Sequence, residues 1–324
     1  VPALLITGNR PGAGKTSLAA ALLAHLHRSG RRAAYWKPFS GSPDTDADVR
    51  FASEVLSEPL GLPPVPPTSP LMQSPLAGDC LREQLASLQG QADVVFIEVP
   101  DGGDTAELAD ALNARVLQVH AYSPGEDPAT VGAAAQQIGG RVAGVILNAV
   151  PIYRRAAIAG EMASQNLPSA TVPESRVMLT VTVEQIAAHL GGEWVLEPVN
   201  IEAPVERYLI GGNIMDSGPT YFGRFANQAV IARVQRPDIH LASMSAQTRC
   251  LVLTGPGEAT EYIKAEARER DIPLIRVQSS TLDTAEALGG ILGQGTAHSL
   301  AKAQHFAGLL TSYAPPEVLS GWLA

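Results

Sequence analysis

A glycine-rich segment near the N-terminus lies between a short apolar run and a longer run typical of an α-helix. The apolar run is Ala3-Leu4-Leu5-Ile6, and the segment reads Gly8-Asn9-Arg10-Pro11-Gly12-Ala13-Gly14-Lys15-Thr16-Ser17. Glycines at such a turn let backbone N–H groups point at phosphate oxygens, a lysine reaches the outer phosphates, and a threonine hydroxyl holds Mg²⁺. The segment is therefore predicted to be a P-loop whose ten residues bind a nucleoside triphosphate, with Lys15 as a catalytic residue.

The spacing within this loop is one residue longer than usual. In the common pattern the first glycine would stand at position 9, which is Asn9, whereas here the glycine is Gly8. A Gly-x5-Gly-Lys-Thr pattern marks a subset of P-loop proteins, and the chain is expected to belong to that subset.

The composition limits the kinds of protein that this chain can be. Its 324 residues exceed a typical domain of roughly 100 to 200 residues, so two domains are expected. No apolar stretch approaches the ~18 residues of a membrane span, and no basic segment followed by an apolar one marks a secretory signal. These features predict a cytoplasmic protein without membrane contacts. The net charge of -9 argues against nucleic acid as a partner.

The cysteines and histidines show no spacing typical of a metal or catalytic site. Cys80 and Cys250 stand far apart with no CxxC pair, so both are predicted to be buried thiols rather than parts of a disulfide or a zinc site. The seven histidines form no pair with a carboxylate partner at metal-ligand spacing, and they are predicted to be structural or solvated.

Short apolar runs alternate with helical stretches over residues 1–200. This alternation predicts an α/β domain, a P-loop NTPase with a mostly parallel sheet and helices on both faces. The expected strands are Ala3 to Thr7, Ala33 to Trp36, Val94 to Val99, Arg115 to Val119, Val142 to Asn148 and Ser169 to Val172. The expected helices are Lys15 to His27, Gly78 to Leu88, Thr105 to Ala111, Thr130 to Ile138 and Val183 to Leu190. Seven prolines between Pro59 and Pro75 predict an extended surface loop there.

A second, smaller α/β domain is expected over residues 205–295, followed by a helical tail over residues 296–324. The expected strands of this domain are Ala229 to Val234, Cys250 to Thr254 and Leu274 to Val277. The expected helices lie near Pro237 to Ala246, Ala259 to Arg270 and Thr284 to Ile291, and the tail helix covers Ser299 to Leu310.

The order of motifs resembles a known combination of domains. Residues 1–200 resemble the dethiobiotin-synthetase-like domain found at the front of some phosphotransacetylases, which is related to the cobyrinic acid a,c-diamide synthases. The matching motifs are the P-loop, Tyr35-Trp36-Lys37-Pro38-Phe39, Asp44-Thr45-Asp46-Ala47-Asp48, Val95-Phe96-Ile97-Glu98, Gly144-Val145-Ile146-Leu147-Asn148 and Val172-Pro173-Glu174. Residues 205–295 resemble the DRTGG domain that follows there, through Leu209-Ile210-Gly211-Gly212, Arg236-Pro237-Asp238, Leu253-Thr254-Gly255 and Ser280-Thr281.

The resemblance implies ATP and Mg²⁺ as ligands. It also implies a homodimer, because relatives of dethiobiotin synthetase build the substrate pocket across a two-fold interface. The second domain is expected to take a small ligand or a protein partner.

The chain departs from the resembled pattern at two motifs. Glu98 is followed by Val99-Pro100-Asp101-Gly102-Gly103 where the family has a glycine directly after the glutamate, and Thr254-Gly255 is followed by Pro256 in place of a second glycine. The phosphotransacetylase catalytic domain would come after the second domain, and it is absent from these 324 residues. Acetyl transfer is therefore not expected.

The resemblance also implies a magnesium site. Mg²⁺ prefers oxygen ligands, and the hydroxyl of Thr16 supplies one of them. In the resembled synthetases another ligand is the acid that ends a core strand, which corresponds to Glu98. A third comes from the acidic run, where Asp48 is preferred by a small margin over Asp46, and the choice among Asp44, Asp46 and Asp48 stays open.

Two further residues are expected in the site. Lys37 follows a strand, which places it at the carboxyl edge of the sheet where open α/β folds bind ligands. In the resembled family this lysine helps to bind the carboxylated substrate and the transferred phosphate, so Lys37 is expected to be catalytic. Asn148 closes an apolar strand and resembles the asparagine that reads the adenine edge in dethiobiotin synthetase.

Two functions fit these residues. The preferred one is a nucleotide-dependent regulatory ATPase that passes its nucleotide state to a partner or a dimer mate. The alternative is an ATP-dependent, ligase-like enzyme that activates a carboxylate by phosphoryl transfer. The substrate of such an enzyme is not predicted by the sequence.

Overall fold

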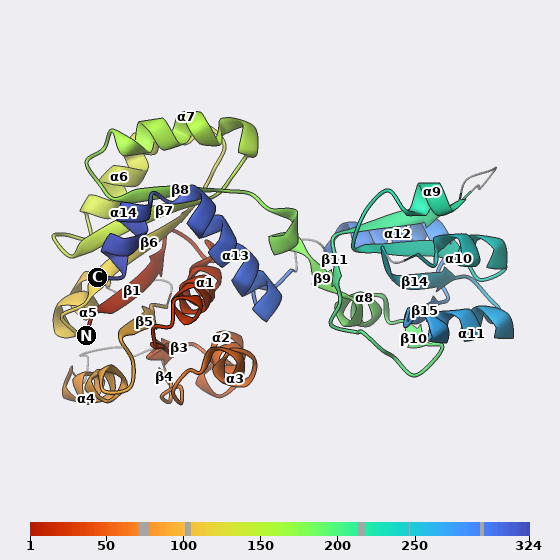
Figure 1. Cartoon of the computed structure of the whole chain (residues 1–324), viewed down its shortest axis with the longest axis horizontal. Coiled ribbons are helices and arrows are strands. Elements are labelled where there is room, and N and C mark those ends of the chain that lie inside the picture. The colour runs from red at the N-terminus through yellow and green to blue at the C-terminus, as the bar shows by residue number, and fades with distance from the viewer. Residues whose placement is uncertain (71–77, 101–104, 213–217, 246, 292–294) are drawn as a thin grey trace. The chain divides into compact units, whose positions relative to one another are not determined.

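The computed structural model describes residues 1–70, 78–100, 105–212, 218–245, 247–291 and 295–324 (Figure 1). The chain forms two compact units. Unit 1 comprises Val1–Ser175 together with Ala297–Ala324, and unit 2 comprises Arg176–Thr296. Within the described residues, every helix is too short or too polar to cross a membrane.

Unit 1 is built on a six-stranded, wholly parallel sheet in the order β2-β5-β1-β6-β7-β8. Its strands are β1 (Ala3–Gly8), β2 (Ala33–Trp36), β5 (Val94–Glu98), β6 (Arg115–Ala121), β7 (Val142–Val150) and β8 (Ser169–Pro173). All six agree with the strands expected from the apolar runs. The central strand β1 is buried on both faces, as parallel sheets between helical layers require.

Helices cover both faces of this sheet (Figure 1). They include α1 (Lys15–Arg28), α4 (Gly78–Gln89), α5 (Thr105–Ala111), α6 (Pro128–Gln136) and α7 (Ile152–Ala163). Two shorter helices, α2 (Ala47–Arg50) and α3 (Ser57–Leu60), contact the π-helix between them. Leucines of α4 and α5 share one core cluster with β1, β2 and β5, and α6 and α7 share another with β7. Both expectations for this domain, a parallel sheet and two helical layers, are confirmed.

Between β2 and α4 the chain forms several short elements. They are the 3₁₀-helix Pro43–Thr45, the π-helix Phe51–Leu56 and a two-stranded pair of β3 (Phe39–Ser40) and β4 (Ser69–Pro70). The expected extended loop from Pro59 begins two residues late, because Pro59 and Leu60 lie within α3. Its residues 71–75 fall outside the described part of the chain.

The C-terminal segment belongs to unit 1. Helices α13 (Leu300–Tyr313) and α14 (Pro316–Trp322) pack against α1 and β7, and Phe306 and Leu310 of α13 are buried. The compact units divide the chain after Ser175 and after Thr296, and the second division lies next to residue 296, where the tail is expected to begin. The limits at residues 200 and 205 stay a prediction.

Unit 2 has its own five-stranded sheet in the order β10-β15-β14-β13-β12, parallel except for β10. Its strands are β10 (Glu193–Trp194), β12 (Arg207–Gly211), β13 (Gln228–Arg233), β14 (Thr248–Thr254) and β15 (Leu274–Val277), and β9 (Val181–Thr182) pairs with β11 (Pro204–Val205). Its helices are the 3₁₀-helix Arg176–Leu179, α8 (Val183–Leu190), α9 (Gly218–Phe222), α10 (Pro237–Ser243), α11 (Glu261–Glu269) and α12 (Thr281–Gly289). The expected smaller α/β domain is confirmed.

The two cysteines differ in their surroundings. Cys250 is buried in β14, and burial raises the pKa of its thiol to about 12. Cys80 is exposed on α4, so the prediction of a buried thiol is wrong at that position. Cys80 lies on the solvent-facing side of an amphipathic helix, and a lone cysteine in the sequence does not indicate which side it is on.

Candidate functional site

The P-loop joins the end of β1 to the first turn of α1. Gly14 precedes the helix with φ +106°, a backbone conformation that side chains rarely adopt. A Cβ at this position would also lie 2.6 Å from Nδ2 of Asn148, so both the backbone and the packing require glycine. Lys15 and Thr16 are therefore the first residues of α1, at the end of a helix that favours negative charge.

Side chains of the loop and of β7 fasten the P-loop to the sheet. Asn9 accepts a hydrogen bond from the backbone N–H of Ala121 at 2.9 Å. Asn148 donates from Nδ2 to the backbone oxygen of Ala13 at 2.9 Å. Arg10 lies on the outer side, where its guanidinium donates to Ser123 Oγ at 3.1 Å. The expected nucleotide-contacting residues thus surround one loop, and Asn148 lies against its backbone.

Three oxygen-bearing side chains from distant parts of the sequence meet beside this loop. The Thr16 hydroxyl lies 3.0 Å from Oδ1 of Asp48 and 2.9 Å from Oε1 of Glu98. The Thr16 hydroxyl has a single proton, so it can donate to only one of the two carboxyl groups. Both contacts are hydrogen bonds at the same time when Thr16 donates to Asp48 and a protonated Glu98 donates to Thr16. These are the residues that the sequence suggested as magnesium ligands.

Asp46 and Asp48 have different tasks in the acidic run. Asp46 caps the N-terminus of α2: its Oδ1 accepts from the backbone N–H groups of Asp48 and Val49, at 3.0 and 3.1 Å. Its other oxygen accepts from Ser40 Oγ at 2.5 Å. Asp48 instead contacts Thr16, and the 3₁₀ residue Asp44 is exposed. The geometry therefore favours Asp48 over the other two aspartates as a metal ligand.

Lys37 lies directly beside these carboxylates. Its Nζ forms ion pairs with Asp46 at 2.8 Å and with Asp48 at 2.5 Å. Burial lowers the pKa of Lys37, but the two carboxylates outweigh this effect and hold the pKa above its ordinary value. In this state the ammonium is charged and turned toward the aspartates.

The two acids at Thr16 have opposite pKa shifts. Burial raises the pKa of Glu98 to about 7, the charge of Asp48 adds to the rise, and Lys37 opposes it. Burial also acts to raise the pKa of Asp48, but hydrogen bonds from His298, Lys37 and Thr16 outweigh it and hold the pKa well below its usual range. A charged Asp48 next to a Glu98 that takes up a proton near neutrality agrees with the contacts of Thr16.

Sequence reasoning missed Tyr35 as a member of this site. Its hydroxyl donates to Oε2 of Glu98 at 2.9 Å, and both side chains are buried. The sequence signal was its place near the carboxyl end of β2, two residues before Lys37.

His298 is the second residue that the sequence did not indicate. Its Nε2 lies 2.8 Å from Oδ1 of Asp48, and its ring packs against Phe51. The prediction that the histidines are structural or solvated did not include a contact with a candidate metal ligand. No local pattern reveals the contact, since His298 and Asp48 are separated by 250 positions.

The donor set fits Mg²⁺ better than a transition metal. In the described part of the chain, no group of three or more His, Cys, Asp or Glu side chains is arranged to hold a metal ion by itself. Mg²⁺ usually needs only one or two carboxylates, because phosphate oxygens and waters complete its shell. Thr16, Asp48 and Glu98 offer one hydroxyl and two carboxylates at the helix end that favours phosphate.

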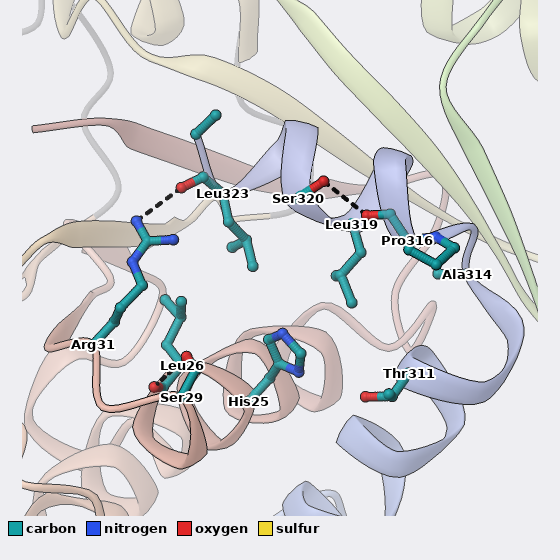
Figure 2. A pocket seen from close by; sticks show the side chains of 11 residues that line it. His25, Leu26, Ser29, Arg31, Thr311, Ala314, Pro316, Leu319, Ser320 and Leu323 are labelled. Carbon is teal, nitrogen blue, oxygen red and sulfur yellow. Dashed lines mark hydrogen bonds between the residues drawn. The ribbon is translucent and has the colours of Figure 1, made fainter.

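A cavity of about 570 Å³ lies elsewhere in unit 1, at the C-terminal end of α1 (Figure 2). Leu26, Leu319 and Leu323 line it, and Arg31 donates to the backbone oxygen of Leu323 at 2.9 Å across its edge. None of its lining residues belongs to the P-loop or to the carboxylate cluster.

Two family comparisons match the two parts of the chain. The AAA domain family matches residues 2–194, and the DRTGG domain family matches residues 185–291. An ATP-dependent dethiobiotin synthetase of Mycobacterium avium (strain 104) is 35% identical over 135 residues, which cover 36% of this chain and 60% of that protein. The chain thus spans about 60% of the length of this relative. The resemblance to a dethiobiotin-synthetase-like P-loop domain followed by a DRTGG domain is confirmed.

Two solved structures are similar to parts of the chain. Signal recognition particle 54 kDa protein from Aeropyrum pernix K1 in complex with GDP is similar with a TM-score of 0.40 at 16% identity, over 54% of this chain and 41% of that chain. The CBS and DRTGG domains of the regulatory region of Clostridium perfringens pyrophosphatase, complexed with the activator diadenosine tetraphosphate, are similar with a TM-score of 0.28 at 13% identity, over 45% and 71% of the two chains.

Proposed function

Because the chain belongs to the AAA domain family over residues 2–194, we propose that it binds Mg-ATP at its P-loop and uses the bound nucleotide to regulate a partner. The observation that carries this proposal is the convergence of Thr16, Asp48 and Glu98 beside the P-loop. One hydroxyl and two carboxyl groups are the kind of oxygen donors that would hold a magnesium ion. No acetyltransferase activity is assigned to these residues.

The residues of the site have distinct parts in this proposal. Lys15 neutralises the charge of the outer phosphates, and Thr16, Asp48 and Glu98 hold the ion, which supplies further positive charge to the phosphates when bound. Lys37 exchanges its ion pairs with Asp46 and Asp48 for a contact with the terminal phosphate. Asn148 stabilises the loop backbone and contacts the base.

The wider setting of the proposal follows from the domain combination. The DRTGG domain receives the output, through a small ligand or a protein partner at unit 2, and the protein acts as a homodimer. A cytoplasmic location suits this function because ATP and Mg²⁺ are both abundant there.

A second candidate is an ATP-dependent, ligase-like enzyme. The observation that favours it is Lys37, whose charged ammonium lies 2.5 Å from Asp48 and so stands next to the expected position of the phosphates. A lysine at this place neutralises charge on a phosphoryl group during its transfer to a carboxylate.

Product analysis separates the two functions. Purified protein is incubated with Mg-ATP, alone and with a panel of dicarboxylates and amino acids, and ADP release is followed together with the oligomeric state. The regulatory proposal predicts slow ADP release that no member of the panel stimulates, and a nucleotide-dependent change in oligomer or partner binding. Stoichiometric ADP formation coupled to a modified carboxylate would contradict it and establish the ligase.

A further inference from the structure

His298 comes immediately after the point where the chain returns from unit 2. Unit 2 ends at Thr296, and the chain belongs to unit 1 again from Ala297 onward. His298 precedes Ser299, the N-cap residue of α13. His298 is therefore the second residue of the segment that returns to the P-loop unit.

This side chain contacts the aspartate that the geometry favours as a magnesium ligand. His298 Nε2 lies 2.8 Å from Oδ1 of Asp48. Because an ionised carboxylate only accepts hydrogen bonds, the proton of this contact is on Nε2 and the imidazole is the donor. The imidazole is half-buried, with 26% of the side chain exposed, so solvent weakens the contact less than at an open surface.

A second contact fixes the plane of the imidazole. The ring of Phe51 lies with its centroid 5.3 Å from that of His298, at an interplanar angle of 57°. Phe51 is buried and is the first residue of the π-helix that follows α2. π-Helical turns are rare in proteins, and those that occur often lie at functional sites. The helix that carries Asp48 and the turn behind it both meet the same histidine.

Asp48 is held by donors from three separate segments. Oδ1 accepts from Thr16 of α1 and from His298, while Oδ2 accepts from Lys37 after β2. With Mg-nucleotide bound, the Thr16 hydroxyl would serve as a ligand of the ion and the Lys37 ammonium would contact a phosphate. His298 is then the donor that stays with Asp48 and keeps its carboxylate oriented.

We propose that His298 is a positioning residue for the metal site: by donating to Asp48 it orients this carboxylate for the magnesium of Mg-nucleotide. The inference rests on the proposed function, since it requires that the P-loop bind Mg-nucleotide. It makes the strength of that binding depend on a side chain next to the end of unit 2. A change in the course of residues 297–299 would alter Mg-nucleotide affinity without touching the P-loop.

Matched variants separate positioning from packing. His298→Phe keeps an aromatic ring against Phe51 but removes the donor, and His298→Gln removes the ring but keeps an N–H donor at similar reach. His305→Phe is the control, because His305 also lies in the returning segment and contacts Ser175 Oγ at 2.8 Å. Calorimetry gives the dissociation constant of ADP for each protein, once with Mg²⁺ and once in EDTA.

The wild type is expected to bind ADP more tightly with Mg²⁺ than in EDTA. His298→Phe should weaken the magnesium-dependent affinity about tenfold, the loss of one hydrogen bond to a charged group, and leave the affinity in EDTA within about twofold. His298→Gln and His305→Phe should stay close to the wild type in both conditions. Equal magnesium dependence in His298→Phe and the wild type, or equal losses with and without Mg²⁺, would overturn the positioning role.

A measurement on the wild type covers the case in which His298→Phe does not fold. In the ¹⁵N spectrum of the histidine side chains, the Nε2 resonance missing from His298→Gln should shift on addition of Mg-ADP and stay in place with ADP in EDTA. A resonance that ignores Mg²⁺ overturns the inference. A wild type that binds no Mg-nucleotide at all refutes the proposed function and this inference with it, whereas normal binding with an unchanged His298→Phe refutes the inference alone.

Discussion

The buried hydroxyl of Tyr35 holds one of the acids of the candidate site in place. It donates to Oε2 of Glu98, a residue with only 2% of its surface exposed. A buried carboxyl oxygen without a donor is costly, because water does not replace the lost hydrogen bond. Tyr35 therefore stabilises both the fold and the orientation of Glu98.

Tyr35→Phe is expected to lower the free energy of unfolding by about 1 to 3 kcal/mol, the cost of one unsatisfied buried acceptor. Urea denaturation in EDTA measures this loss without any metal. The control is Tyr122→Phe, whose hydroxyl accepts from Arg154 Nη1 at 2.8 Å at the surface and whose loss should change stability by less than about 0.5 kcal/mol. Equal stabilities of the two variants would contradict the account of Glu98.

The loss of stability caused by Tyr35→Phe should depend on pH. The folded pKa of Glu98, about 7, lies above its ordinary value of 4.5, so its protonated form stabilises the fold at low pH and this stabilisation is lost as the pH rises through 7. The hydrogen bond from Tyr35 favours the ionised form. The destabilisation by Tyr35→Phe in EDTA should therefore be larger at pH 8 than at pH 5.

Among the elements, α14 and β7 pack more closely than ordinary side chains allow. A Cβ at Gly144 of β7 would lie 2.3 Å from Nε1 of Trp322 and 2.4 Å from the backbone oxygen of Pro168. The contact with backbone cannot be relieved by a rotamer change. Glycine at this position therefore allows helix α14 to pack directly against β7.

Gly144→Ala is expected to destabilise the protein by about 1 to 3 kcal/mol or more, because an extra methyl group is forced into a filled space. Gly308→Ala is the matched control: Gly308 lies in α13, a Cβ there meets nothing within 4 Å, and alanine should stabilise the helix by about 0.5 to 1 kcal/mol. Urea midpoints of the two variants should move in opposite directions. An unchanged midpoint for Gly144→Ala would show that α14 does not pack on β7 in this way.

Elements were predictable from the sequence where one face is buried. The strands of unit 1 are apolar runs, and the P-loop is a contiguous motif, so both were identified. Helix α7 was missed although its sequence is amphipathic, and of its residues only Ile158 and Met162 are buried. Strand β12, at an edge of the sheet of unit 2, was also missed, and only Gly211 of its residues is buried.

On the scale of the whole molecule, the unpredicted feature is the return of the chain to its first unit. The P-loop unit contains residues 297–324, whose helix α13 buries Phe306 and Leu310 against it. Sequence composition shows that the tail is helical but not which unit it packs on, because an apolar helix face fits any apolar surface. The contact between His298 and Asp48 depends on this return and was out of reach of sequence reasoning for the same reason.

The central claim of the account is that the P-loop binds nucleotide through Lys15 and Mg²⁺. Isothermal calorimetry with Mg-ATP, Mg-ADP and Mg-GTP tests it on the wild type, on Lys15→Ala and on Lys264→Ala, a control that removes a lysine of α11 paired with Glu261 in unit 2. The account predicts Mg-ATP binding to the wild type and the control, and an affinity lower by about a hundredfold in Lys15→Ala, since a charged contact to phosphate is lost. Equal affinity of Lys15→Ala and the wild type, or no binding to the wild type, would contradict the assignment of the site.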